Sequence, residues 1–242
     1  MMLDMDHVPW IPRREIEAKA TGVIAEARRT LGTEIRPPIP IEAIIENVFD
    51  LHLLVDNLTE RYPHLAPGDD LLGATLVTER QILIHEKLLD DSTRSGRYFF
   101  TCAHELGHWV LHRELGEGPP RLGECSKPDP AILCRLSHSR KRGEWQADYL
   151  AACLLMPEAE VREAYQRAVS DKPLLLVNRD SCVCRKGRPL WLEPVLSHAP
   201  YFAERVIEEG DFLNVSKAAM CVRLRELGLL INGVNMPWLA TA

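Results

Sequence analysis

The sequence lacks an apolar run long enough to cross a membrane, and its first residues lack the pattern of a secretory leader. No stretch approaches the roughly 20 consecutive apolar residues that span a bilayer. Asp4 and Asp6 stand where a leader would carry positive charge, and no apolar segment of leader type follows them. We therefore expect a cytoplasmic protein without a membrane partner.

An excess of positive charge is also absent, and the cysteines follow no regular pattern. The formal net charge is −6, which does not favour general binding to nucleic acid, although a local basic patch is compatible with it. The seven cysteines are odd in number and scattered, so we expect free thiols in a reducing compartment. Cys182 and Cys184 form a Cys-x-Cys pair, but without a second Cys or His pair they do not favour another metal site.

What is present is the composition of a globular protein with a substantial core. Hydrophobic residues make up 46% of the chain and charged residues 26%, which is an ordinary balance for such proteins. We find no internal repeat and no low-complexity tract. The length suits one large domain, or a main domain with a smaller one.

Hydrophobic periodicity predicts helices and strands in the first half of the chain. Apolar residues recur at helical spacing before Gly32, which is placed to cap the first helix. The short link at Glu79 and Arg80 predicts a hairpin between two strands. The predicted elements are helices at 15–31, 41–48 and 95–112 and strands at 51–55, 72–78 and 81–85.

The second half is predicted to begin with a long surface loop over residues 113–141. This segment is rich in Gly and Pro, and it is longer than the loops that a compact domain usually carries. It could be a lid or a segment sensitive to processing, but a plain insertion is the favoured interpretation. Helices are predicted at 143–156, 157–169 and 199–230, with extended chain at 174–196.

Residues 104–108 read HELGH, an HExxH motif inside the long predicted helix. His104 and His108 lie one turn apart on the same helix face, so their imidazoles can converge on one metal ion. Glu105 lies about 100° round the helix from His104, within reach of a water on that metal. Zinc lowers the pKa of a bound water to about 7, and a carboxylate can then take its proton. The motif predicts His104 and His108 as zinc ligands and Glu105 as the catalytic base.

His112 follows His108 by four residues and shares its helix face. It lies about 12 Å along the helix axis from His104, which is too far for both to bind one ion. We expect His112 to pack in the core or to contact a ligand without touching the metal.

A catalytic zinc takes three protein ligands and keeps a fourth position open, so a third ligand must come from elsewhere. Glu144 opens the predicted helix 143–156, and Asp148 lies one turn further on the same face. We expect Glu144 to bind zinc and Asp148 to accept the free N–H of His104. The alternative is that both carboxylates belong to a solvated acidic face. The carboxylates of the loop are poorer candidates because a loop does not pre-position them: Glu114, Glu117, Glu124 and Asp129.

Two sequence blocks resemble the ImmA/IrrE metallopeptidase family. Residues 97–112, RYFFTCAHELGHWVLH, resemble that family's zinc helix. Residues 144–157, EWQADYLAACLLMP, are similar to its E-x-x-A-[DN]-x-F-A-x-x-L-L-M-P block, with Leu150 in place of the usual Phe. The order of elements over residues 38–85 is also similar, so the resemblance covers about half of the chain.

The resemblance implies an α+β, zincin-like domain of the gluzincin type with a small antiparallel or mixed sheet. It implies zinc as the cofactor, with His104, His108 and Glu144 as ligands and Glu105 as the base. It also implies an edge strand within residues 73–85 that aligns substrate by β-addition. Members of the family are site-specific endopeptidases, which typically cleave a helix-turn-helix repressor and so release stress-response or mobile-element genes. The expected partner is therefore a protein substrate, a DNA-binding repressor.

We expect the metallopeptidase domain to span residues 1–170 and a C-terminal segment to span 171–242. Within that segment, a turn at 214–216 with Ser216 as a helix cap predicts a helix-turn-helix-like pair. Arg223 and Arg225 could then face DNA, although ordinary helix packing is the favoured role.

A rival hypothesis is a non-proteolytic regulator that binds DNA or a partner protein through these C-terminal helices, with a structural or vestigial metal site. The presence of Glu105 favours the endopeptidase, because a structural site needs no base and closes its fourth position. Direct binding to nucleic acid is thus the less favoured interpretation.

Overall fold

We describe the fold from a computed structural model, in which the described residues are 5, 7–63, 71–89, 95–116, 131–135, 141–176 and 198–232. The chain divides into two compact units, Met1–Pro157 and Glu158–Ala242. None of the helices in this described part is both long enough and apolar enough to cross a membrane.

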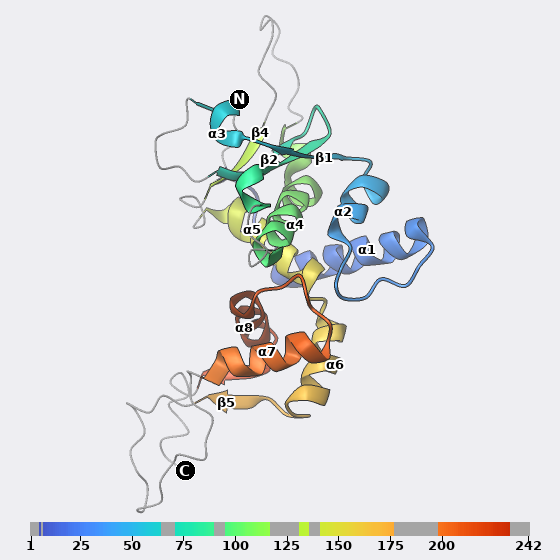
Figure 1. The fold of residues 1–242 in the computed structure, drawn as a ribbon, viewed down its shortest axis with the longest axis vertical. Coiled ribbons are helices and arrows are strands. Elements are labelled where there is room, and N and C mark those ends of the chain that lie inside the picture. The colour runs from blue at the N-terminus through green and yellow to red at the C-terminus, as the bar shows by residue number, and fades with distance from the viewer. Residues whose placement is uncertain are drawn as a thin grey trace, which may run out of the picture. The chain divides into compact units, whose positions relative to one another are not determined.

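The first unit contains a four-stranded mixed sheet (Figure 1). The strand order is β1-β3-β2-β4, with β1 parallel to β3 and with β2 antiparallel to both β3 and β4. The predicted hairpin between β2 and β3 is confirmed. The strands are β1 (His52–Asp56), β2 (Leu71–Leu76), β3 (Gln81–His85) and β4 (Ala131–Arg135).

Helices cover one face of this sheet. The central helix α4 (Ser95–His112) packs against β2 and β3 and also against α5 (Arg142–Leu155). Helix α1 (Arg13–Leu31) packs against α5, and Gly32 caps it with a left-handed backbone, as predicted. The shorter elements are α2 (Ile41–Ala43), which continues as the π-helical η1 (Ile44–Val48), α3 (Leu58–Arg61), and the 3-10 turns η2 (Glu86–Leu88) and η4 (Arg113–Gly116).

Strand β2 is buried along its whole length, and alternation divides its side chains between the two faces of the sheet. Ala74 and Leu76 pack with Leu58 of α3 in an apolar cluster. Gly73 and Thr75 lie on the opposite face of the sheet, where they contact Glu105 of α4. The alternation of β2 therefore places this strand directly against the HExxH motif.

Two expectations about the sheet were wrong. Residues 113–141 are not all loop, because 131–135 form β4; within that range, 117–130 and 136–140 lie outside the described residues. The implied edge strand within 73–85 is also not observed, because β3 lies between β1 and β2, and β2 lies between β3 and β4. The loop was predicted because residues 113–141 are rich in Gly and Pro, and the short apolar run at 131–135, which pairs with β2, was not recognised as a strand. In the described part of the chain, the edge strands are β1 and β4.

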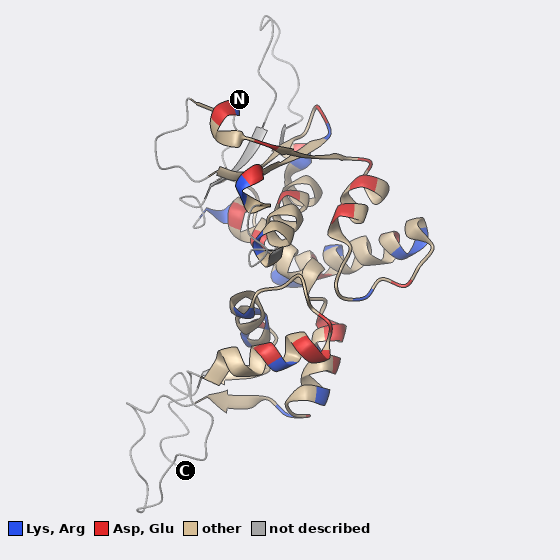
Figure 2. Ribbon diagram, viewed as in Figure 1, with Lys and Arg blue, Asp and Glu red and all other residues tan. Residues whose placement is uncertain are grey.

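The second unit contains three helices and a two-stranded parallel sheet in its described part. Helix α7 packs against both α6 and α8. Figure 2 shows residues of both charge signs on α6 and α7, where Arg167 pairs with Glu209 at 2.7 Å. The elements are α6 (Glu158–Ala168), β5 (Leu174–Leu176), α7 (Ala199–Glu209), α8 (Lys217–Glu226) and β6 (Leu230–Asn232).

Ser216 caps α8, as the sequence predicted, because its hydroxyl accepts a hydrogen bond from the Ala219 amide at 3.1 Å. The less favoured alternative, in which Arg223 faces DNA, does not fit its side chain, which is completely buried. Arg225 is exposed. Whether α7 and α8 act as a helix-turn-helix stays a prediction.

Two other expectations concern the second half of the chain. The predicted domain boundary at residue 170 stays a prediction; in the structure, α6 packs with α7 and belongs to the second unit. The Cys182 and Cys184 pair lies outside the described residues, as does the rest of the predicted extended chain after β5.

Candidate metal centre

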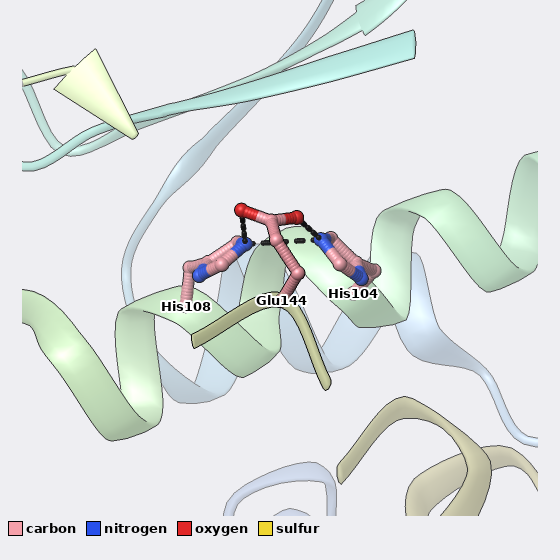
Figure 3. Close-up of side chains that lie close together, drawn as sticks. All are labelled: His104, His108 and Glu144. Atoms are coloured by element: carbon pink, nitrogen blue, oxygen red, sulfur yellow. Dashed lines mark hydrogen bonds and ion pairs between the residues drawn. The ribbon is translucent and has the colours of Figure 1, made fainter. Parts of the chain in front are cut away.

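The structure brings His104, His108 and Glu144 together, although Glu144 is far from the histidines in the sequence (Figure 3). The two Nε2 atoms lie 2.9 Å apart. Glu144 Oε2 lies 3.3 Å from His104 Nε2, and Glu144 Oε1 lies 3.6 Å from His108 Nε2. All three ligand atoms lie within 4.8 Å of one another, which is close enough to surround one ion.

A close approach of two helices makes this convergence possible. At Gly107, in the middle of the motif, a Cβ atom would lie 3.0 Å from the backbone oxygen of Ala147 on α5. Any larger residue would push the two helices apart. Since Glu144 precedes Ala147 by one turn, the small residue at 107 lets the third carboxylate reach the histidines.

The hydrogen bond of His104 leaves a lone pair on its metal-side nitrogen when the ring is neutral. Its Nδ1 lies 2.8 Å from Asp148 Oδ1, and an ionised carboxylate can only accept. His104 therefore donates from Nδ1, and in a neutral ring its Nε2 is an acceptor. The contact joins the two residues that the sequence pairs, and the role of Asp148 beside a metal ligand stays a prediction.

The three converging groups fit a metal cation. Glu144 has a side-chain exposure of only 2%, and its Oε1 has no hydrogen-bond partner among the described residues. Burial raises the pKa of Glu144, and hydrogen bonds and positive charge from His104 and His108 lower it below its usual value. The Glu144 carboxyl group is therefore ionised when a cation, whether a proton on the histidines or a metal ion between the three groups, faces it. A buried anion that faces nitrogen lone pairs needs a positive charge. Two imidazoles and a carboxylate are one of the ligand sets that metal ions have in catalytic sites.

Glu105 is completely buried beside the three converging side chains, and one of its two carboxylate oxygens accepts a hydrogen bond. The Thr75 hydroxyl donates to Glu105 Oε2 at 2.7 Å, whereas Oε1 has no partner among the described residues. Burial raises the pKa of Glu105 to about 8, although the neighbouring His104 and the Thr75 hydrogen bond oppose the rise. A carboxylate with one fixed oxygen and a raised pKa is suited to accept a proton.

Sequence reasoning missed the residues of β2 that shape the surroundings of Glu105. A Cβ atom at Gly73 would lie 2.9 Å from the Glu105 carboxyl carbon, so glycine is needed for the strand to pass this close. Thr75 supplies the hydrogen bond. The alternation along residues 72–78 could have placed both residues on one face, but it could not have shown that this face meets Glu105.

His112 does not belong to the metal group, as expected, and both of its ring nitrogens have partners. Its Nδ1 lies 3.0 Å from His108 Nδ1, and its Nε2 lies 2.9 Å from Gln146 Oε1. Burial, followed by the neighbouring His108, lowers the pKa of His112 to about 4, so its ring is neutral near pH 7.

This buried His-His-Glu group fits the metal site of a metallopeptidase. Residues 88–179 match the family model of the IrrE N-terminal-like domain, a peptidase family. The matched segment holds the HExxH motif, Glu144 and Asp148. Over residues 88–179 the chain is thus similar to the ImmA/IrrE peptidase family, which confirms the resemblance of the two sequence blocks. No curated protein matches the chain in sequence.

Replacing Asp148 by alanine should weaken metal binding without removing a ligand. The substitution removes the acceptor that orients His104, and the loss of such a partner typically lowers metal affinity about 10–100-fold. Competition with a chromophoric chelator would measure the change. The exposed Asp171 provides the control, since Asp171→Ala should leave the affinity unchanged. Equal metal affinities of Asp148→Ala and Asp171→Ala would mean that Asp148 does not contribute to metal binding.

Proposed function

We propose that the protein is a zinc-dependent endopeptidase that hydrolyses a peptide bond in a protein substrate. One observation carries the proposal: a buried carboxylate, Glu105, keeps one oxygen without a partner among the described residues beside a group of three ligands. A structural zinc site uses four protein ligands and needs no such base. The group of His104, His108 and Glu144 instead leaves one coordination position for water and substrate.

The roles of the residues follow from their contacts. His104, His108 and Glu144 would hold the zinc ion, which supplies a Lewis acid for the scissile carbonyl and for the attacking water. Glu105 accepts the proton of that water at Oε1 and can pass it to the leaving amine. Thr75 holds the other oxygen, so the Glu105 carboxylate keeps one orientation during this transfer.

The proposed substrate is a helix-turn-helix transcriptional repressor, in stress-response or mobile-element regulation. This part of the proposal rests on the family of the domain rather than on the site itself. The buried Arg223 weakens the rival hypothesis of a DNA-binding regulator, since that side chain is not available for phosphate contacts.

Cleavage of a repressor tests the proposal. The full chain would be incubated with the product of a neighbouring regulator gene, and fragments would be mapped by mass spectrometry. We expect cleavage at one site, which a chelator abolishes and added zinc restores. An intact repressor at stoichiometric enzyme would refute this substrate. Cleavage that the chelator does not affect would refute the metal mechanism.

A further inference from the structure

We propose that His112 is a positioning residue, which orients the ring of His108 and fixes its tautomer so that Nε2 is free to bind the metal. The proposal rests on the proposed metal site, but it concerns a hydrogen-bond chain that exists without the metal. The chain runs from His108 through His112 and Gln146 to the backbone of Pro9.

Each link of this chain is short and buried. His108 Nδ1 and His112 Nδ1 are 3.0 Å apart, and His112 Nε2 lies 2.9 Å from Gln146 Oε1. Gln146 Nε2 lies 2.8 Å from the Pro9 carbonyl oxygen. The three side chains are at most 1% exposed, so water does not compete for these hydrogen bonds.

The donor and acceptor of each hydrogen bond in this series are fixed, because the last group, the Pro9 carbonyl, can only accept a hydrogen bond. The Pro9 carbonyl takes a hydrogen bond from the Gln146 amide nitrogen, which turns Gln146 Oε1 toward His112. His112 must then carry its proton on Nε2, and in the neutral ring its Nδ1 is an acceptor. His108 therefore donates from Nδ1, and its Nε2 keeps a lone pair on the side of Glu144.

The two histidines of the motif are thus oriented by different means. His104 donates to a carboxylate, Asp148, on the partly exposed side of the site. His108 donates to a neutral imidazole, His112, inside the core. If His112 served only to fill space in the core, it would not need a polar partner on each ring nitrogen. An apolar side chain would fill the same space without a desolvation cost.

The end of the chain is anchored by the segment that precedes α1. The Gly143 amide donates to the Met5 carbonyl at 3.0 Å, and Arg142 donates to the Val8 carbonyl at 3.1 Å. The Trp10 ring stacks on Trp145 with centroids 5.1 Å apart. These contacts all reach the first turn of α5. They hold the Pro9 carbonyl in place relative to Gln146, and so they fix the acceptor that gives the chain its direction.

The test compares His112→Phe, which keeps the ring shape but has no acceptor, with His112→Asn, whose amide oxygen can take the place of Nδ1. Nitrogen-15 NMR of the imidazoles in the metal-free full chain reads the tautomer of His108 directly. Zinc affinity is measured by chelator competition. His52, exposed on β1, provides the matched control as His52→Phe.

We expect His108 to carry its proton on Nδ1 in the wild type and in His112→Asn, but to lose this preference in His112→Phe. Zinc affinity should fall about 10–100-fold in His112→Phe, recover in His112→Asn, and stay unchanged in His52→Phe. Should His112→Phe fail to fold, Gln146→Leu tests the same chain, because it removes the acceptor of His112 and should release the tautomer of His108.

A folded His112→Phe or Gln146→Leu protein that keeps the Nδ1–H tautomer of His108 and the zinc affinity of the wild type would overturn the proposal. The tautomer is read without metal and without substrate. A protein that shows the expected tautomer change but cleaves no peptide would therefore refute the endopeptidase function and leave the role of His112 standing.

Discussion

A Glu105→Gln variant is expected to lose peptide hydrolysis by a factor of about 10²–10⁴ while it still binds zinc. The amide has nearly the same shape as the carboxylate, and its oxygen can still accept the hydrogen bond of Thr75. What is lost is the ability of the free oxygen to take a proton. Steady-state kinetics on the cleaved substrate, together with metal analysis of the same sample, measures both properties.

The control is Glu114→Gln, an exposed glutamate in the turn that follows α4. It should keep both the rate and the metal. Full hydrolysis by Glu105→Gln would rule out the carboxylate as the base. If zinc and activity were lost together, Glu105 would instead be needed for the architecture of the site.

Removal of Glu144 is expected to affect metal binding more strongly than any other single change outside the histidines. A Glu144→Ala variant keeps two imidazoles but loses the only anionic ligand of the group. Its zinc affinity should fall by more than the 10–100-fold expected for a residue that only orients a ligand. Thermal or denaturant unfolding with and without zinc provides a second measurement, since a ligand at 100 times its Kd stabilises a protein by about 2.7 kcal/mol.

We expect zinc to stabilise the wild type and to have little effect on Glu144→Ala at the same concentration. The exposed Glu46 in η1 offers the matched control, because Glu46→Ala removes a carboxylate from the same unit without touching the site. A Glu144→Ala protein that zinc stabilises as strongly as the wild type would show that the third ligand is a different residue.

The local parts of the site could be predicted from the sequence, because the geometry of one helix determines them. The spacing of His104 and His108 puts both rings on one face wherever that helix lies. Glu144 and Asp148 required a second signal, since their approach depends on the packing of α5 on α4 at Gly107. The sequence block that begins at Glu144 supplied that signal.

The remaining features depend on contacts between distant segments, which periodicity does not encode. Nothing in the sequence links Gln146 to Pro9. The series of hydrogen bonds from His108 to Pro9 could therefore not be predicted. The pairing of β4 with β2 was missed because local composition favoured a loop. The sequence also left open whether Arg223 faces DNA or packs in the fold, and only the structure shows that its side chain is completely buried.

Because β4 occupies the outer edge of β2, the strand nearest to Glu105 has hydrogen-bonding neighbours on both sides. A segment tethered in the same chain competes with any free peptide at an effective concentration on the order of millimolar. An extended stretch of another protein could pair with β2 only by displacing β4, and it would need to outbind that internal competitor. Otherwise it would add beside β4, an edge strand in the part of the chain that the structure describes, and would lie one strand further from Glu105, about 4.8 Å away in the plane of the sheet.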